Sequence, residues 1–120
     1  PVLTPVITHI RPAQLADWLA EATPDGGPLP LVLDVREPWE VQTARVTAAG
    51  FELRHLPMAS IPLRLAELPA DRPIACLCHH GARSAQVAHF LLSRGYPEVV
   101  NIQGGIELWS DELDPTVPRY

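Results

Sequence analysis

Residues 78–84 read CHHGARS and contain the side chain of this chain that is best suited to covalent chemistry, the thiol of Cys78. Residues 74–77 before it form an apolar run of strand length, and the pattern of residues 84–94 after it predicts a helix. A thiol at such a junction faces the helix N-terminus, whose free N–H groups and dipole favour an anion. Arg83 adds a positive charge nearby. Both effects favour the thiolate, so we predict that Cys78 is an activated nucleophile.

The neighbours of Cys78 are interpreted as parts of its loop. His79 is expected at the mouth, where substrate arrives, and His80 is expected to tune charge or to donate hydrogen bonds. Gly81 allows the backbone to turn with its N–H inward, where a side chain would obstruct. Ser84 has two open roles, a hydrogen bond to the thiolate and a plain helix cap.

The two adjacent histidines also raise the question of a metal site. The possible ligands lie too close in sequence to surround one tetrahedral ion easily, and no distant pair completes the set. They are Cys76, Cys78, His79 and His80. We therefore predict no metal. Cys76 itself is predicted to pack inside its strand, with a role as a resolving thiol as the alternative.

Composition limits the class of protein and its partners. The 120 residues are 47% hydrophobic, which predicts one globular domain over residues 1–120. The net charge is −5 and the 9 basic residues are scattered, so neither nucleic acid nor an anionic membrane is an expected partner. No apolar run approaches the roughly 20 residues of a membrane span, and no signal-peptide pattern opens the chain. A disulfide between Cys76 and Cys78 would be strained, so reduced thiols and a cytoplasmic location are expected.

Predicted strands alternate with predicted helices along the whole chain. The strands are expected at residues 7–10, 31–35, 53–56, 74–77 and 98–102, and the helices at 12–21, 37–41, 62–68, 84–94 and 106–109. Residues 23–30 are expected to form a turn-rich loop, and residues 47–52 fit no element clearly. This alternation predicts an α/β fold, with a mostly parallel sheet covered by helices on both sides. Cys78 would then lie at the carboxyl end of a central strand, where ligands bind in such sheets.

Several motifs in this order resemble the rhodanese-like sulfurtransferase domain. They are LDVRE at residues 33–37, the loop at 78–84, NIQGGI at 101–106 with Trp109, and the tail at 114–120, which is similar to that of a bacterial single-domain branch. The resemblance implies a three-layer α/β/α fold with a five-stranded, mostly parallel sheet. It also implies that Cys78 accepts a sulfane sulfur as a persulfide and passes it to a nucleophile.

The loop length and two departures refine this resemblance. Four residues separate Cys78 from Arg83, as is typical of sulfur-handling members, whereas phosphatase-like members have one more. The position after the cysteine, often arginine in thiosulfate-using members, is His79, which makes the pocket mouth less cationic. The family's His-Ile-x-Gly-Ala segment is not visible, and residues 47–51 are taken to stand in its place.

Residues outside the loop are expected to support it. Asp34 and Arg36 are interpreted as an ion-pair scaffold behind the loop, together with Glu37 or Glu40, in preference to a catalytic pair. Arg83 has two open roles, pairing with a carboxylate and providing a field at the sulfur. Trp39 is the tryptophan expected to border the pocket.

These observations predict a sulfurtransferase that needs no cofactor. Cys78 takes the sulfane sulfur of a small sulfur-containing anion such as thiosulfate, and a small thiol, cyanide or a protein accepts it. The persulfide is stabilised by the N–H groups of the loop, formed by His79, His80, Gly81, Ala82, Arg83 and Ser84. The alternative is a sulfur-carrier or redox-sensing module with little turnover of its own. A small phosphatase or arsenate reductase is disfavoured by the loop length.

Overall fold

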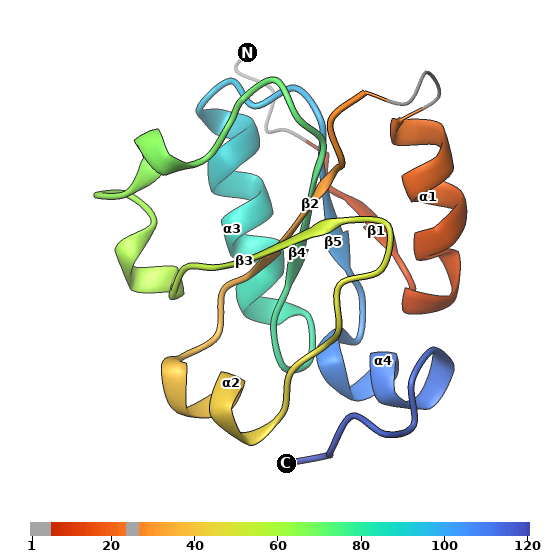
Figure 1. Cartoon of the computed structure of the whole chain (residues 1–120). Helices are drawn as coiled ribbons and strands as arrows, with labels where there is room; N and C mark the ends of the chain where they lie inside the picture. The colour runs from red at the N-terminus through yellow and green to blue at the C-terminus, as the bar shows by residue number, and fades with distance from the viewer. Residues whose placement is uncertain (1–5, 24–26) are drawn as a thin grey trace.

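The computed structural model describes residues 6–23 and 27–120, and a five-stranded parallel sheet lies at its centre (Figure 1). The strand order is β1-β5-β4-β2-β3, and each neighbouring pair is parallel. The strands are β1 (Thr8–Ile10), β2 (Leu31–Asp34), β3 (Glu52–His55), β4 (Ile74–Leu77) and β5 (Val99–Ile102). The helices are α1 (Leu15–Ala22), α2 (Pro38–Thr43), α3 (Ala82–Ser93) and α4 (Gly105–Glu112). The predicted α/β class and five-stranded parallel sheet are confirmed.

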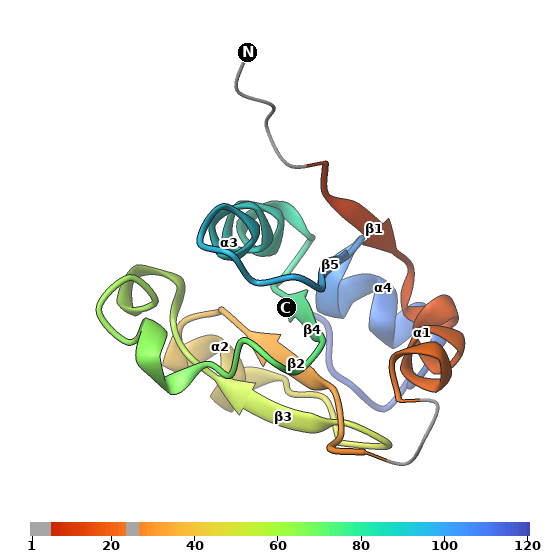
Figure 2. The ribbon, with the colours of Figure 1, turned by 90° about the horizontal axis from the view of Figure 1, so that it is seen from above.

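Helices cover both faces of the sheet, which gives three layers (Figure 2). All four residues of β2 and of β4 are buried, as expected for strands covered on both sides. Their side chains alternate between two cores: Leu33 and Cys76 lie in the core that includes residues of α3, whereas Val32 and Ala75 lie in the core that includes Leu15 and Trp109. Cys78 continues the alternation on the α3 side.

The helix predicted at residues 62–68 is wrong. Two 3-10 turns, Met58–Ser60 and Leu65–Glu67, flank a turn at residues 61–64 instead. Pro69 contributes to the difference, because it disfavours a helical conformation in the residue before it. Leu68 is accordingly extended, with φ −101° and ψ 122°.

The other boundaries differ little from those predicted. The predicted loop at residues 23–30 lies partly outside the described residues, because residues 24–26 are not among them. In the parts that are described, no helix is long and apolar enough to cross a lipid bilayer.

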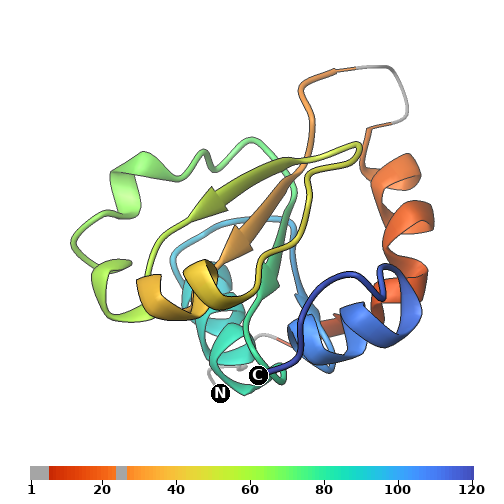
Figure 3. The same cartoon turned by 60° about the horizontal axis from the view of Figure 1, so that its bottom comes forward.

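The segments that carry the candidate site residues meet at one end of the molecule. The carboxyl ends of the strands point towards it, and α2, the loop after β4, the start of α4 and the C-terminal tail lie there together (Figure 3). Parallel strands necessarily bring their carboxyl ends to one edge, so residues 34–40, 78–84 and 103–107 become neighbours.

Candidate active site

Cys78 lies at the base of a short loop that joins β4 to α3. Gly81 precedes the helix with φ +105°, a left-handed conformation that favours glycine, and its N–H donates to Cys78 Sγ at 3.0 Å. Ser84 Oγ lies 3.2 Å from the same sulfur. Cys78 is only 1% exposed, so the sulfur can be reached by a narrow group alone. The arrangement suits a thiol that gains one further small atom.

The first turn of α4 holds the loop from behind. Ile106 N donates to Cys78 O at 2.9 Å, and Glu107 N donates to His79 O at 3.3 Å. This approach requires the glycine at position 105, because a Cβ there would lie 2.3 Å from His79 O and 2.4 Å from Cys78 O. The second glycine of the NIQGGI motif thus serves the active-site loop, whereas a Cβ on the first, Gly104, would meet the side chain of Leu108.

We predict that Gly105→Ala will displace the loop and reduce the rate of Cys78 alkylation at least about tenfold, because the new Cβ overlaps backbone that cannot rotate away. Gly95→Ala is the matched control, since Gly95 also has a positive φ, +91°, but a Cβ there meets nothing within 4 Å. The control is expected to lose about 1 kcal/mol of unfolding free energy and to keep normal alkylation. Equal alkylation rates in the two variants would contradict this role of Gly105.

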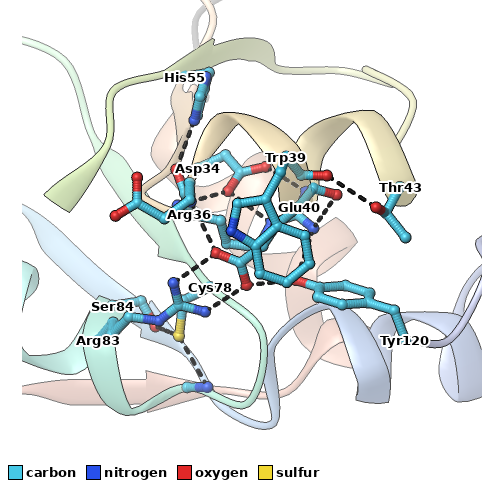
Figure 4. Close-up of polar contacts among 12 residues, drawn as sticks. Asp34, Arg36, Trp39, Glu40, Thr43, His55, Cys78, Arg83, Ser84 and Tyr120 are labelled. Atoms are coloured by element: carbon cyan, nitrogen blue, oxygen red, sulfur yellow. Dashed lines mark hydrogen bonds and ion pairs between the residues drawn. The ribbon is translucent and has the colours of Figure 1, made fainter.

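Arg83 pairs with the buried carboxylate of Glu40 and its guanidinium is turned towards α2 (Figure 4). The two bonds, Nη1 to Oε2 at 2.7 Å and Nη2 to Oε1 at 2.8 Å, form a bidentate pair. The Arg83 guanidinium lowers the pKa of Glu40 to about 2, and Glu40 in turn raises the pKa of Arg83. Of the two open roles of Arg83, the geometry favours the structural one, because its charge is matched by a carboxylate.

Asp34 and Arg36 form a second buried pair behind the loop. Arg36 Nε and Nη2 donate to the two Asp34 oxygens at 2.9 and 2.7 Å, and Arg36 is fully buried. Burial alone lowers the pKa of Arg36, but hydrogen bonds with Asp34 and Tyr120 raise it above its ordinary value. Neither side chain has a hydrogen bond to Cys78 among the described residues, which is the geometry of a scaffold.

His55, at the end of β3, completes this scaffold and is not among the residues expected from the sequence. Its Nε2 lies 2.6 Å from Arg36 O. Residues 55–59 read HLPMA, which shares its His and Ala with the family segment that residues 47–51 were taken to replace. Phe51 instead lies in the core with Trp109.

Tyr120 is a further site residue that the sequence did not reveal. Its hydroxyl donates to Glu40 Oε1 at 2.9 Å and accepts from Arg36 Nη1 at 3.0 Å, so it joins the two ion pairs. Burial raises the pKa of Tyr120. The tail motif was the available signal, but it says nothing of the partners, which lie about 80 residues away.

Aromatic rings form the rim beside the loop. Tyr120 stacks on His79 with centroids 3.9 Å apart, and His79 stacks on His80 at 3.8 Å. Trp39, 61% exposed, packs edge to face with Tyr120 (Figure 4). Burial and the neighbouring His80 lower the pKa of His79, so this ring is neutral near pH 7.

The remaining loop residues have simpler places. His80 is exposed and its Nε2 lies 2.9 Å from Glu107 Oε2, while Ala82 begins α3. Among residues 6–23 and 27–120, no group of three or more His, Cys, Asp or Glu side chains is arranged to hold a metal ion.

Comparison with known proteins places this site in a family. The model of the rhodanese-like domain matches residues 15–112. A sulfurtransferase of Allochromatium vinosum is 39% identical over 87 residues, which are 72% of this chain and 78% of that protein. The thiosulfate sulfurtransferase GlpE of Stutzerimonas stutzeri is 32% identical over 79 residues, covering 66% of this chain and 69% of the relative.

A solved structure agrees with the sequence matches. The crystal structure of a rhodanese-related protein from Thermoplasma volcanium has a TM-score of 0.70 at 30% identity and covers 94% of this chain and 99% of its own. Some relatives are longer. The probable adenylyltransferase/sulfurtransferase MoeZ of Mycobacterium tuberculosis matches 92% of this chain, but the matched residues are only 26% of that relative. The family match covers strands β2 to β5, the Cys78 loop and α4, and the chain therefore belongs to the rhodanese-like domain family.

Proposed function

We propose that the protein is a rhodanese-type sulfurtransferase that carries a sulfane sulfur as a persulfide on Cys78. The observation that carries this proposal is the position of Cys78 Sγ, which accepts the Gly81 N–H at 3.0 Å at the N-terminus of α3. The thiolate attacks the outer sulfur of thiosulfate, the S–S bond breaks, and sulfite leaves with the bonding electron pair. Similarity to a sulfurtransferase and to GlpE supports this chemistry.

The second half of the reaction returns the thiolate. An acceptor such as cyanide, a small thiol or a protein thiol attacks the outer sulfur of the persulfide, and Cys78 leaves as thiolate. Cyanide would become thiocyanate. Because the donor and acceptor react in turn at one sulfur, we expect ping-pong kinetics. Both cysteines are free, which is consistent with a reducing compartment, and we propose the cytoplasm.

The burial of Cys78 supports sulfur over phosphate as the transferred group. A terminal sulfur is a single atom on a single bond and can enter a loop that leaves Cys78 only 1% exposed. A phosphoryl group carries three more oxygens, each of which needs a hydrogen-bond donor. Arg83 is not oriented to donate to phosphoryl oxygens, because two of its guanidinium nitrogens are bonded to Glu40.

A second candidate, a sulfur carrier that discharges to a specific partner, is favoured by the composition of the rim. Arg83 is paired with Glu40 and His79 is neutral near pH 7, so these residues offer a free thiosulfate anion little positive charge. Exposed Trp39 and the stacked rings of His79 and Tyr120 offer an apolar surface instead.

We expect reduced protein incubated with thiosulfate to gain the mass of one sulfur atom on Cys78 and to lose it when cyanide is added. Intact-mass measurement with peptide mapping checks both half-reactions. If Cys78 gains no sulfur from thiosulfate but is loaded from polysulfide and discharges only to a partner thiol, the carrier function replaces the enzymatic one. If neither donor loads Cys78, both candidate functions are excluded.

A further inference from the structure

A chain of hydrogen bonds leads from the sulfur of Cys78 to the opposite side of its loop. Cys78 Sγ lies 3.2 Å from Ser84 Oγ, and Ser84 Oγ lies 2.5 Å from Asn101 Oδ1 on β5. Asn101 Nδ2 lies 3.2 Å from Gly81 O and 3.0 Å from His9 Nδ1 on β1. Cys78, Ser84 and Asn101 are all buried, so water does not compete for these groups.

The direction of each bond in this chain follows from Gly81. A backbone carbonyl can only accept, so the group of Asn101 that faces Gly81 O must be its NH₂. The amide oxygen of Asn101 then faces Ser84, and the Ser84 hydroxyl must donate to it. His9 Nδ1 lies 3.0 Å from the same NH₂ and can accept its second hydrogen.

This direction leaves Cys78 without the Ser84 proton. A serine hydroxyl has one hydrogen, and here it is directed to Asn101, so Ser84 presents a lone pair to Sγ. The thiol satisfies that contact by donating its own S–H. A thiolate has no hydrogen to donate, so Ser84 must rotate towards it and leave the buried Asn101 Oδ1 without a donor.

We propose that Asn101 is a positioning residue that withholds the Ser84 proton from Cys78 and so disfavours the free thiolate relative to the persulfide. In the persulfide the negative charge lies on the outer sulfur, and Sγ carries neither a proton nor a full charge. This Sγ has no hydrogen for Ser84 either, but its charge is smaller than that of the thiolate, so it competes less with Asn101 for the Ser84 hydroxyl. A less stabilised thiolate is also the stronger nucleophile towards sulfur. The inference rests on the proposed function only in assigning Cys78 as the sulfur carrier.

The test is a double-mutant cycle on the pH profile of Cys78 alkylation, measured with iodoacetamide and peptide mapping in the absence of any sulfur donor. Asn101→Val frees Ser84 to donate to the thiolate and is expected to move the midpoint of the profile to lower pH by about one unit, the size of one charge-assisted hydrogen bond. In the Ser84→Ala background the same substitution is expected to move the midpoint little, because the hydroxyl is absent.

The cycle separates this role from simple support of the loop. Asn101 also binds Gly81 O, and if that were its whole effect, Asn101→Val would shift the midpoint equally with and without Ser84, which would overturn the proposal. An upward shift in Asn101→Val would overturn it as well. His9→Ala is the matched control: it removes one partner of Asn101 but leaves Gly81 O to fix the amide, so the midpoint is expected to stay in place.

A second variant keeps the proposal testable if Asn101→Val does not fold. Ser84→Ala alone is expected to leave the midpoint close to that of the unmodified protein, because Asn101 competes with the thiolate for the Ser84 hydroxyl hydrogen. A rise of about one unit would mean that Ser84 donates freely to the thiolate, and the proposal would fail. The titration uses no sulfur donor. If the mass experiment showed no persulfide, the proposed function would be excluded, but the result of this titration would not change.

Discussion

Replacement of Cys78 by serine is expected to reduce sulfur transfer from thiosulfate to cyanide by at least about a thousandfold, the usual consequence of removing a covalent nucleophile. A serine hydroxyl has nearly the same shape, so Gly81 N–H and Ser84 Oγ keep a partner of similar size. It ionises at far higher pH than a thiol, and an oxygen cannot hold the sulfur as a disulfide-like persulfide. The fold is expected to remain, with an unfolding free energy within about 1 kcal/mol of the starting value.

The measurement is the steady-state rate of thiocyanate formation, with the intact mass of each variant after incubation with thiosulfate. Cys76→Ala is the control. Cys76 is completely buried, and burial raises the pKa of its thiol, so it is unreactive where it stands. This variant is expected to lose about 1 kcal/mol of stability through the small cavity and to keep its turnover. Turnover that survives in Cys78→Ser, or a persulfide mapped to Cys76, would show that Cys78 is not the nucleophile.

The central strands could be predicted from sequence because their signals are local. Residues 31–33 and 74–77 are short apolar runs, and such runs between turn residues indicate strands buried on both faces. The placement of Cys78 followed, because a residue just after a central parallel strand must lie at the binding edge of the sheet. The prediction at 62–68 is wrong because a proline marks a helix start only locally: Pro38 begins α2, whereas Pro62 lies in a turn between two 3-10 turns and Pro69 keeps Leu68 extended.

The scaffold around the loop was only partly predictable, because its contacts are long-range. The pairing of Asp34 with Arg36 is visible in sequence, since a single residue separates them within one motif. The partner of Arg83 is not, because Glu40 lies 43 residues earlier and reaches Arg83 only after β2 and β4 pair. Tyr120 reaches Glu40 across most of the chain. No local pattern specifies which carboxylate meets which arginine once the sheet is formed.

Glu40→Gln is expected to destabilise the protein by about 3 kcal/mol at neutral pH, because the pKa of Glu40 falls from 4.5 to about 2 on folding. The buried carboxylate accepts from both Arg83 nitrogens, from the Tyr120 hydroxyl and from Glu37 N. A glutamine amide presents an NH₂ to one of these donors, so a donor faces a donor and the Arg83 charge loses its partner.

The stability lost in Glu40→Gln is expected to depend on pH in a definite direction. A carboxyl whose pKa is lowered in the folded state stabilises that state fully above its ordinary pKa of 4.5, and the contribution disappears as the pH falls towards about 2. The difference in unfolding free energy between the two proteins is therefore expected to be constant near neutral pH and to shrink below about pH 4.5. Chemical denaturation at a series of pH values measures this difference.

The control for this series is Glu67→Gln, which removes the carboxylate of the exposed Arg64–Glu67 pair. Water screens that pair and competes for both side chains, so its loss is expected to change stability far less than the loss of Glu40. A pH-independent difference for Glu40→Gln would mean that the loss comes from the amide NH₂ facing another donor and not from the missing charge. A small difference at neutral pH, equal to that of Glu67→Gln, would mean that Arg83 and Tyr120 hold their positions without Glu40. The loop after Cys78 would then be fixed by the first turn of α4 and by Asn101, without help from Glu40.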